Sequence, residues 1–183
     1  MSAKVLVFLA AGFEEVEAVS IIDVLRRGGV DVTVAGVGSG SSVCGAHDIE
    51  LGVDCAAVSV SPDDYDAVVL PGGMPGAENL AASDPVLDAI RTVHAGGKIV
   101  AAICAAPLVL AKAGVVSGKR VTCYPGFEER VTGAECTGAR VERDGNIVTG
   151  KGPGAALEFG LELLAVMGEV EIANRLREGM LVG

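Results

Sequence analysis

The sequence predicts an α/β fold: a doubly wound, flavodoxin-like three-layer sandwich with a mostly parallel sheet and one β-hairpin. Three observations indicate this fold class. Strand-like and helix-like segments alternate along the chain, the strand-like segments are almost continuously apolar, and glycine-rich turns separate them. Strands that are apolar on both faces need helices on both sides, and right-handed crossovers then produce the doubly wound arrangement. We expect a single domain over residues 1–183.

The amino-terminal elements follow from apolar runs and helical spacing. Residues 4–9 form a buried strand, and residues 14–27 have a helical spacing that a pair of glycines ends. Residues 31–35 form the second strand. The Gly/Ser-rich stretch that follows is expected to be a loop, and residues 47–53 a short side strand.

The central elements repeat the same alternation. Residues 65–70 are a third buried strand that ends in a Pro-Gly-Gly turn, and residues 84–94 have helical character. Residues 98–103 are the fourth strand, and a helix is expected over about 107–113. A short strand is expected at residues 120–123.

The carboxyl-terminal part contains the hairpin. Asp144-Gly145 lies between two alternating runs in RVERDGNIVTG, which is a strong hairpin signal. Two further helices are expected, over residues 155–167 and 169–177. In such folds, ligands meet the loops at the carboxyl ends of the parallel strands.

Charge and composition exclude several classes of partner. The formal charge is −10, and the 14 Lys and Arg residues are scattered rather than gathered in a stripe. A nucleic-acid backbone or an anionic membrane surface therefore finds no basic patch. The longest uncharged apolar run, residues 99–111, is too short to span a bilayer. We expect neither a nucleic-acid partner nor a membrane partner.

The five cysteines are odd in number and form no CxxC pair, which favours free thiols over a disulfide framework or a zinc site. The first apolar run, residues 5–11, is followed at once by acidic residues, so it indicates a strand rather than a secretion signal. We therefore expect a cytoplasmic protein with no bound metal.

One cysteine stands at a junction between a strand and a helix. The fourth strand ends at Ile103 and the next helix begins by Pro107, so the backbone must turn sharply at Cys104. Unpaired N–H groups and the helix dipole at such a turn favour a thiolate. The alternative is that Cys104 is a small buried hydrophobic residue among alanines.

A histidine partner for this cysteine is not evident. His94 precedes the fourth strand, and at strand spacing it lies about 20 Å from Cys104, at the opposite end of the sheet. His47 lies in an irregular region and cannot be placed from the sequence. A conventional Cys-His dyad within one chain is therefore not expected.

Acidic residues at the start of the first helix are the remaining candidates. Negative charge is favoured at a helix amino terminus, which accounts for Glu14 and Glu15. Glu17 lies one turn further in and can face Cys104 if the first and fourth strands are neighbours. An ionised Glu17 would repel a thiolate, whereas a buried Glu17 with a raised pKa stays protonated and donates a hydrogen bond to it.

The pair Gly72-Gly73 follows the third strand and leaves its N–H groups open to close approach, as an oxyanion hole requires. The alternative is an ordinary tight turn. A phosphate or dinucleotide loop is weakly supported, because neither GxGxxG nor GxxxxGK[ST] occurs.

Together, these segments resemble the DJ-1/ThiJ/PfpI superfamily, and specifically its DJ-1 branch. The stretches that carry the resemblance are LAAGFEEVEAV, DVLRRGGVDVTVAGV, YDAVVLPGGMPGAENL, KIVAAICAAPLVLAKAGV and RVERDGNIVTGKGPGAALEFGLELL. The resemblance implies that Cys104 is a reactive, peroxide-sensitive cysteine and that Glu17 is a protonated glutamate hydrogen-bonded to it. It implies that the N–H groups of Gly73 and Ala105 stabilise an oxyanion, and that the protein is a homodimer without a cofactor.

Two positions depart from the family pattern. The protease-like PfpI branch has a histidine directly after the cysteine, where this chain has Ala105, so peptidase activity is not expected. Many DJ-1 proteins have a histidine in the segment equivalent to VTCYPG, where this chain has Tyr124. A tyrosine is a poor base at neutral pH, which leaves Glu17 as the proton shuttle and gives Tyr124 a role in orienting substrate.

The resemblance implies two classes of function. The first is a cysteine-dependent, cofactor-independent glyoxalase III or deglycase that acts on small 2-oxoaldehydes such as methylglyoxal or on their glycated adducts. The alternative is an oxidative-stress sensor or redox-regulated chaperone, in which Cys104 is oxidised to a sulfinate that Glu17 stabilises. A flavodoxin-like cofactor binder is disfavoured, because the predicted rim has no aromatic residues to enclose a flavin.

Overall fold

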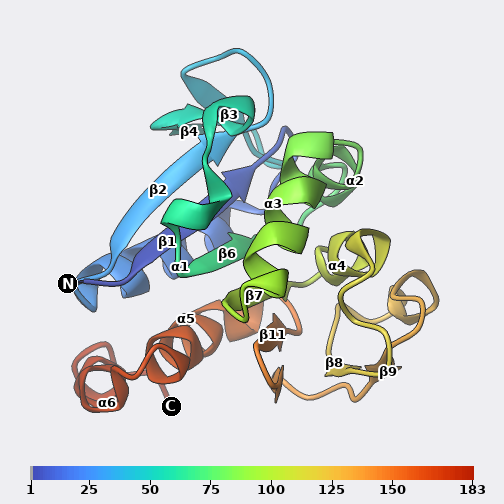
Figure 1. Ribbon diagram of the computed structural model, residues 1–183. Helices are drawn as coiled ribbons and strands as arrows, with labels where there is room; N and C mark the ends of the chain where they lie inside the picture. The colour runs from blue at the N-terminus through green and yellow to red at the C-terminus, as the bar shows by residue number, and fades with distance from the viewer. Residues whose placement is uncertain (1) are drawn as a thin grey trace.

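The predicted fold class is confirmed. A computed structural model describes residues 2–183 and shows a central sheet with helices on both faces (Figure 1). Seven strands form this sheet in the order β10-β11-β7-β6-β1-β2-β5, and all neighbours are parallel except the β10–β11 hairpin. The strands of the sheet are β1 (Lys4–Leu9), β2 (Asp31–Gly36), β5 (Cys55–Ala56), β6 (Ala67–Leu70), β7 (Ile99–Ile103), β10 (Val141–Asp144) and β11 (Ile147–Gly150).

The helices divide into two groups. They are α1 (Glu15–Arg27), α2 (Gly76–Ala81), α3 (Asp84–Ala95), α4 (Pro107–Ala113), α5 (Ala156–Val166) and α6 (Val170–Gly179). Helix α1 packs on α5, and α6 packs on α5, whereas α2, α3 and α4 pack on one another. Figure 1 shows α3 in front of the sheet and α1 behind it.

The buried apolar residues form one contiguous cluster between the sheet and the two helical layers. Strand β1 contributes a run of completely buried residues, as a parallel strand covered on both faces should. Three of the four phenylalanines, Phe8, Phe13 and Phe159, are among its largest side chains. No helix in the part of the chain that the structure describes is long and apolar enough to cross a bilayer.

Most predicted elements are present, with ends that match or differ by at most three residues. The third strand begins at Ala67 rather than at residue 65, and the strand predicted at 120–123 is only β8 (Arg120–Val121). Strand β8 pairs with β9 (Glu135–Cys136), which was not predicted, in a small separate sheet. Helix α2 and strand β5 were not predicted either.

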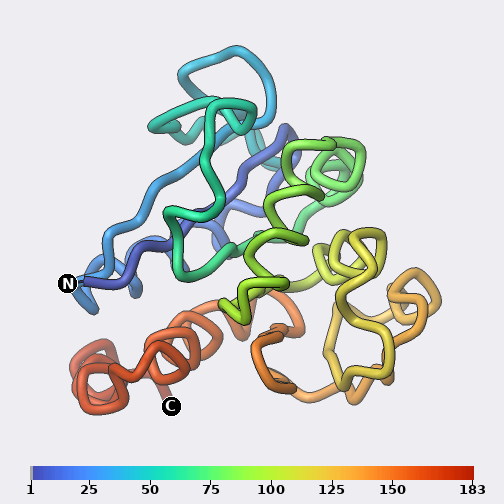
Figure 2. Tube along the Cα trace, in the orientation of Figure 1, coloured from blue at the N-terminus to red at the C-terminus, as the bar shows by residue number. Residues whose placement is uncertain are grey.

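The region after the second strand differs from the prediction. The Gly/Ser-rich stretch expected to be a loop contains β3 (Ser42–Cys44), which pairs antiparallel with β4 (Glu50–Gly52). The side strand predicted over 47–53 is therefore shorter and belongs to a separate two-stranded sheet. In Figure 2 the segment that contains β3 and β4 projects away from the main sheet and then returns to it.

The hairpin prediction is confirmed. Strands β10 and β11 pair antiparallel, with Asp144 opposite Ile147, and Gly145 takes a left-handed φ of 64° in the turn between them. Strand β11 also pairs parallel with β7, so the hairpin extends the main sheet next to the strand that leads to Cys104.

Candidate active site

Cys104 lies at the sharp turn between β7 and α4, and its backbone is in the left-handed region with φ 63°. This conformation is uncommon for a residue other than glycine, and it persists only where its surroundings hold it. The Cys104 N–H donates to the Gly150 carbonyl at 2.9 Å, and the Cys104 carbonyl accepts from the Tyr124 N–H at 2.8 Å. Both backbone groups of Cys104 are therefore held by neighbouring segments.

The groups around the sulfur differ in part from the sequence prediction. Helix α4 has seven residues and begins at Pro107, as predicted, and Cys104 lies three residues before it. The favourable interactions come from two individual amides, because the N–H groups of Gly73 and Ala105 lie near the sulfur and act to lower the pKa of Cys104. These are the two residues that the family resemblance implies for an oxyanion site.

The two glycines after β6 are needed for different reasons. A Cβ at Gly72 would lie 2.6 Å from the Cys104 Cβ and 2.8 Å from the Ile103 carbonyl oxygen, so no side chain fits there. Gly73 has φ 90°, and a Cβ there would lie 2.4 Å from the Glu14 nitrogen. Close backbone approach therefore lets the β6 turn meet the Cys104 turn.

Glu17 is completely buried, and it reaches this site from α1. Its Oε2 accepts a hydrogen bond from the Gly72 N–H at 2.7 Å. The Cys104 thiol lies within hydrogen-bonding range of the carboxyl, yet Oε1 is buried without an aligned partner among the described residues. The expectation that Glu17 faces Cys104 is met by this geometry.

The expectation that Glu17 faces Cys104 was made on the condition that the first and fourth strands are neighbours, and this condition is wrong. The two strands are β1 and β7, and β6 lies between them. Glu17 still reaches Cys104 because its carboxyl is bound by Gly72, the residue two positions after β6, whose backbone also approaches Cys104. The route from helix to cysteine therefore passes across the end of the intervening strand.

Glu17 and Cys104 titrate as a pair. Burial raises the pKa of Glu17 to about 7, although the hydrogen bond from Gly72 and the nearby Cys104 thiol oppose the shift. Burial and the neighbouring Glu17 carboxylate raise the pKa of Cys104 to about 12, and the amides of Gly73 and Ala105 act in the opposite direction. The amides therefore act to lower the pKa of Cys104, as predicted, but burial and the Glu17 carboxylate have the larger effect. Two adjacent buried acids resist carrying two charges, so the pair holds a single negative charge between these values.

The other acidic residues of this helix start have separate roles. The Glu14 side chain caps α1 by accepting the Glu17 N–H at 2.7 Å, as the sequence predicted. Glu15 instead binds His47: its carboxylate accepts from the His47 backbone N–H at 2.6 Å and lies 2.7 Å from His47 Nδ1. The hydrogen bond to Glu15 raises the pKa of His47.

Within the described residues, Glu14, Glu15 and His47 are also the group whose ligand atoms lie close enough together to hold a metal. Their donor atoms are already engaged in the helix cap and the Glu15–His47 pair. His94, as expected, lies away from Cys104 and contacts Asn146 in the turn of the hairpin.

Tyr124 is close to Cys104 through its backbone, while its ring extends outward and is 45% exposed. The ring packs beside Gly152, where a Cβ would lie 3.1 Å from the Tyr124 Cδ2, and it meets Phe127 edge-on. It lines a pocket of about 220 Å³ with the Gly152–Ala155 loop and with Arg140 and Lys151. Nothing in the local sequence pattern indicated that this loop would line a pocket beside Tyr124.

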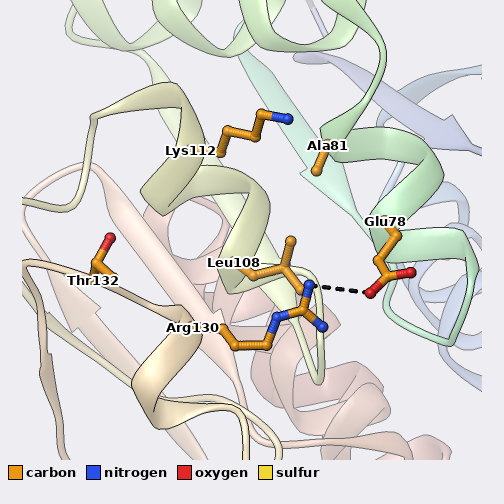
Figure 3. Close-up of a pocket in the computed structure, with 6 residues that line it drawn as sticks. All are labelled: Glu78, Ala81, Leu108, Lys112, Arg130 and Thr132. Atoms are coloured by element: carbon orange, nitrogen blue, oxygen red, sulfur yellow. Dashed lines mark ion pairs between the residues drawn. The ribbon is translucent and has the colours of Figure 1, made fainter.

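A second pocket, of about 480 Å³, lies between α2 and α4 (Figure 3). The residues that line it are Glu78, Ala81, Leu108, Lys112, Arg130 and Thr132. Arg130 forms an ion pair with Glu78 at 3.1 Å, as the dashed line in Figure 3 marks. None of these six is a site residue predicted from the sequence, so pocket size alone does not indicate the reactive centre.

Comparison with known proteins relates this geometry to a family. A model described as the DJ-1/PfpI family matches residues 3–166. The protein dj-1beta of Drosophila melanogaster is 41% identical over 184 residues, which cover 100% of this chain and 98% of that protein. A Pyrococcus abyssi protein named as a deglycase is 36% identical over 153 residues, which cover 82% of this chain and 91% of its own.

Solved structures agree with the sequence comparison. The crystal structure of Drosophila melanogaster DJ-1beta matches with a TM-score of 0.96 and 42% identity, and each chain is covered completely. A structure of Toxoplasma gondii DJ-1, described as oxidized, matches with a TM-score of 0.94 and 38% identity over 98% of both chains. The match of the family model, the full-length identity and the shared fold together confirm the resemblance, and the chain belongs to the DJ-1/PfpI family.

Proposed function

We propose that this protein is a cysteine-dependent, cofactor-independent enzyme of the glyoxalase III or deglycase type that acts on small 2-oxoaldehydes. The observation that carries the proposal is the completely buried carboxyl of Glu17 beside the Cys104 thiol. One carboxyl oxygen accepts a hydrogen bond from Gly72, and the other has no aligned partner within residues 2–183. An acid and a nucleophile held together in this way suit a reaction that needs both attack on carbon and proton transfer. The Pyrococcus relative named as a deglycase supports the same reaction class.

Hydrogen bonding favours a negative sulfur and a protonated Glu17 as the resting form of the pair. An ionised carboxylate would leave Oε1 as a buried charged oxygen without an aligned donor, which is costly. A protonated Oε1 instead donates to the sulfur, while Oε2 still accepts from Gly72. The amides of Gly73 and Ala105 then stabilise the charge on Cys104.

The proposed reaction begins with attack of the Cys104 thiolate on the aldehyde carbon of methylglyoxal, which gives a hemithioacetal. The sulfur loses its charge on forming this bond, so the Gly73 and Ala105 amides become available to the new oxyanion. Glu17 gives its proton to that oxygen and becomes a base. It then moves a proton from the aldehyde carbon to the adjacent carbon through an enediol, while the hydroxyl proton passes to the neighbouring ketone oxygen, which gives a lactoyl thioester. Water hydrolyses this thioester, releases lactate and restores the Cys104 sulfur with its proton shared with Glu17.

In the proposal, the substrate that reaches Cys104 is small. Ala105 and Gly73 present little bulk, and the Tyr124 ring and the Gly152–Ala155 loop line the neighbouring pocket of about 220 Å³. In the proposal, the Tyr124 hydroxyl orients the substrate by donating a hydrogen bond, in the place where many relatives have a histidine.

The direct test follows methylglyoxal loss and lactate formation with the wild type, Cys104→Ala and Glu17→Gln. We expect lactate from the wild type, none above background from Cys104→Ala, and a loss of at least a hundredfold in kcat for Glu17→Gln, since general acid–base catalysis contributes roughly 10²–10⁴ in rate. Cys44→Ala, which changes an exposed thiol, is the matched control and should retain wild-type turnover. Equal rates for the wild type and Cys104→Ala would remove the proposal.

A second candidate function uses the same geometry without turnover. The buried Glu17 carboxyl and the two amides can equally stabilise a sulfinate on Cys104, which would make the protein an oxidative-stress sensor or redox-regulated chaperone. Mass spectrometry after mild peroxide treatment tests this reading. Two added oxygens should be confined to Cys104, and oxidation spread evenly over all five thiols would count against it.

We also propose that the protein acts as a homodimer in the cytoplasm. Support for the dimer comes from apolar side chains left exposed near the start of α1, namely Val16 and Val19, together with Ile49 at the β3–β4 hairpin. The five free thiols suit a reducing compartment. Light scattering on the purified protein should give twice the monomer mass, and a monomer at micromolar concentration would contradict the dimer.

A further inference from the structure

Two cysteines outside the Cys104 site lie together in the small β8–β9 sheet. The register pairs Val121 with Cys136, and the ladder continues with a hydrogen bond from the Thr137 N–H to the Val121 carbonyl at 2.8 Å. Cys123 follows Val121 by two residues. Between them, Thr122 turns the other way: its hydroxyl donates to the Ala139 carbonyl at 2.7 Å. Cys123 therefore lies on the same side as Val121 and Cys136.

The register brings the two thiols near each other, and after burial the proximity of Cys136 is the main cause that raises the pKa of Cys123. Cys123 is buried, with 3% of its surface exposed, whereas Cys136 is partly exposed. One member of the pair is thus partly accessible to a small oxidant, and the other is sheltered from solvent.

We propose that Cys123 and Cys136 are a second redox site, at which peroxide forms a reversible intramolecular disulfide. The accessible Cys136 thiolate attacks a peroxide oxygen, which breaks the O–O bond and gives a sulfenic acid and one water after protonation. The Cys123 sulfur then displaces the hydroxyl of the sulfenic acid, forms the S–S bond and releases a second water. Two thiols are oxidised, one hydrogen peroxide is reduced, and a dithiol reductant reverses the change.

This site is distinct from Cys104 but adjacent to it in the chain. The residue after Cys123 is Tyr124, whose N–H holds the Cys104 carbonyl at 2.8 Å. The disulfide closes the loop from Cys123 to Cys136, which contains that contact. Formation of the disulfide does not depend on any activity of Cys104. The proposed function and the Cys123–Cys136 site can therefore be tested independently.

The sequence makes the test direct, because trypsin separates the relevant thiols. Cleavage after Arg120, Arg130 and Arg140 places Cys123 in the peptide of residues 121–130 and Cys136 in the peptide of residues 131–140. Cleavage after Lys98 and Lys112 isolates Cys104 in a third peptide. The wild type is treated with limiting peroxide, denatured, alkylated without reduction and digested.

We expect the 121–130 and 131–140 peptides to appear covalently joined, with two hydrogens fewer than their sum, and to separate after reduction. The intact denatured protein should keep the mass of one chain. Cys104→Ala should give the same joined peptides, whereas Cys136→Ser should leave Cys123 alkylated. The proposal is overturned if both thiols are alkylated at a peroxide dose that oxidises Cys104, if Cys123 is joined to another cysteine, or if the bond links two chains.

Discussion

The Glu17 carboxyl lies beside the Cys104 thiol although the strands that lead to the two residues, β1 and β7, are not neighbours in the sheet. Gly72 at the end of the intervening strand makes the connection, because its N–H binds Glu17 and its missing side chain admits Cys104. The distance between Glu17 and Cys104 depends on how closely three segments approach one another: the start of α1, the turn after β6 and the turn after β7. Small changes in the packing of these segments should therefore affect the site measurably.

Gly72→Ala should destabilise the protein and disturb the cysteine. The added methyl would lie within 3 Å of both the Cys104 Cβ and the Ile103 carbonyl, and neither can move without shifting β7. We expect the free energy of unfolding to fall by about 2–3 kcal/mol. Urea denaturation measures this change. Gly154→Ala is the control, because nothing lies within 4 Å of its Cβ position, and its effect should stay within about 0.5 kcal/mol.

Gly160→Ala tests how α1, the helix that carries Glu17, is positioned on α5. A Cβ at Gly160 would lie 3.0 Å from the Val24 Cβ, and a valine in a helix has one strongly preferred rotamer with which to respond. We expect a net loss of about 1 kcal/mol, because overpacking exceeds the gain in helix propensity. Adding Val24→Ala should relieve the clash, so the double variant should be more stable than the sum of the single effects predicts. Additivity within about 0.5 kcal/mol would mean that the two residues are not coupled.

The Glu15–His47 pair should make stability depend on pH. Its hydrogen bonds raise the pKa of His47 above its usual 6.5 and, despite burial, lower the pKa of Glu15 below its usual 4.5. The His47 contribution is complete below 6.5 and is lost as pH rises through the raised value; the Glu15 contribution is complete above 4.5 and is lost as pH falls through the lowered value.

The stability difference between the wild type and His47→Gln should therefore be largest at about pH 5–6 and should shrink towards pH 8. Urea denaturation across this range measures it. In a Glu15→Gln background the same substitution should show no such pH dependence. A constant difference at every pH would mean that the pair does not titrate as described.

The turn at Cys104 was predictable from the sequence because both of its boundaries are local. An apolar run ends at Ile103 and a proline suited to the first helical turn follows at Pro107, which leaves almost no loop. The link between the Gly73 amide and Cys104 came only from the family resemblance, because Gly73 follows another strand and its approach to Cys104 depends on sheet order. For the same reason, the correct expectation about Glu17 was attached to the wrong pair of neighbouring strands.

The missed elements are short. Strands β5 and β9 have two residues each, too few for any hydrophobic alternation to be visible. Helix α2 begins with a glycine and has six residues, which is less than two turns of helical pattern. The contact between Cys123 and Cys136 depends on the β8–β9 pairing, so spacing along the chain could not reveal it.

The central claim is that one buried charge is shared by Glu17 and Cys104 and resides on the sulfur, and the pH dependence of Cys104 alkylation in the wild type and in Glu17→Gln tests it most directly. We predict a wild-type inflection near pH 7, where the pair loses its first proton, and an equal or moderately higher value in Glu17→Gln, because a neutral amide replaces a stronger hydrogen-bond donor. A wild-type inflection near 12 that falls steeply in Glu17→Gln would place the charge on the carboxylate instead and contradict the account.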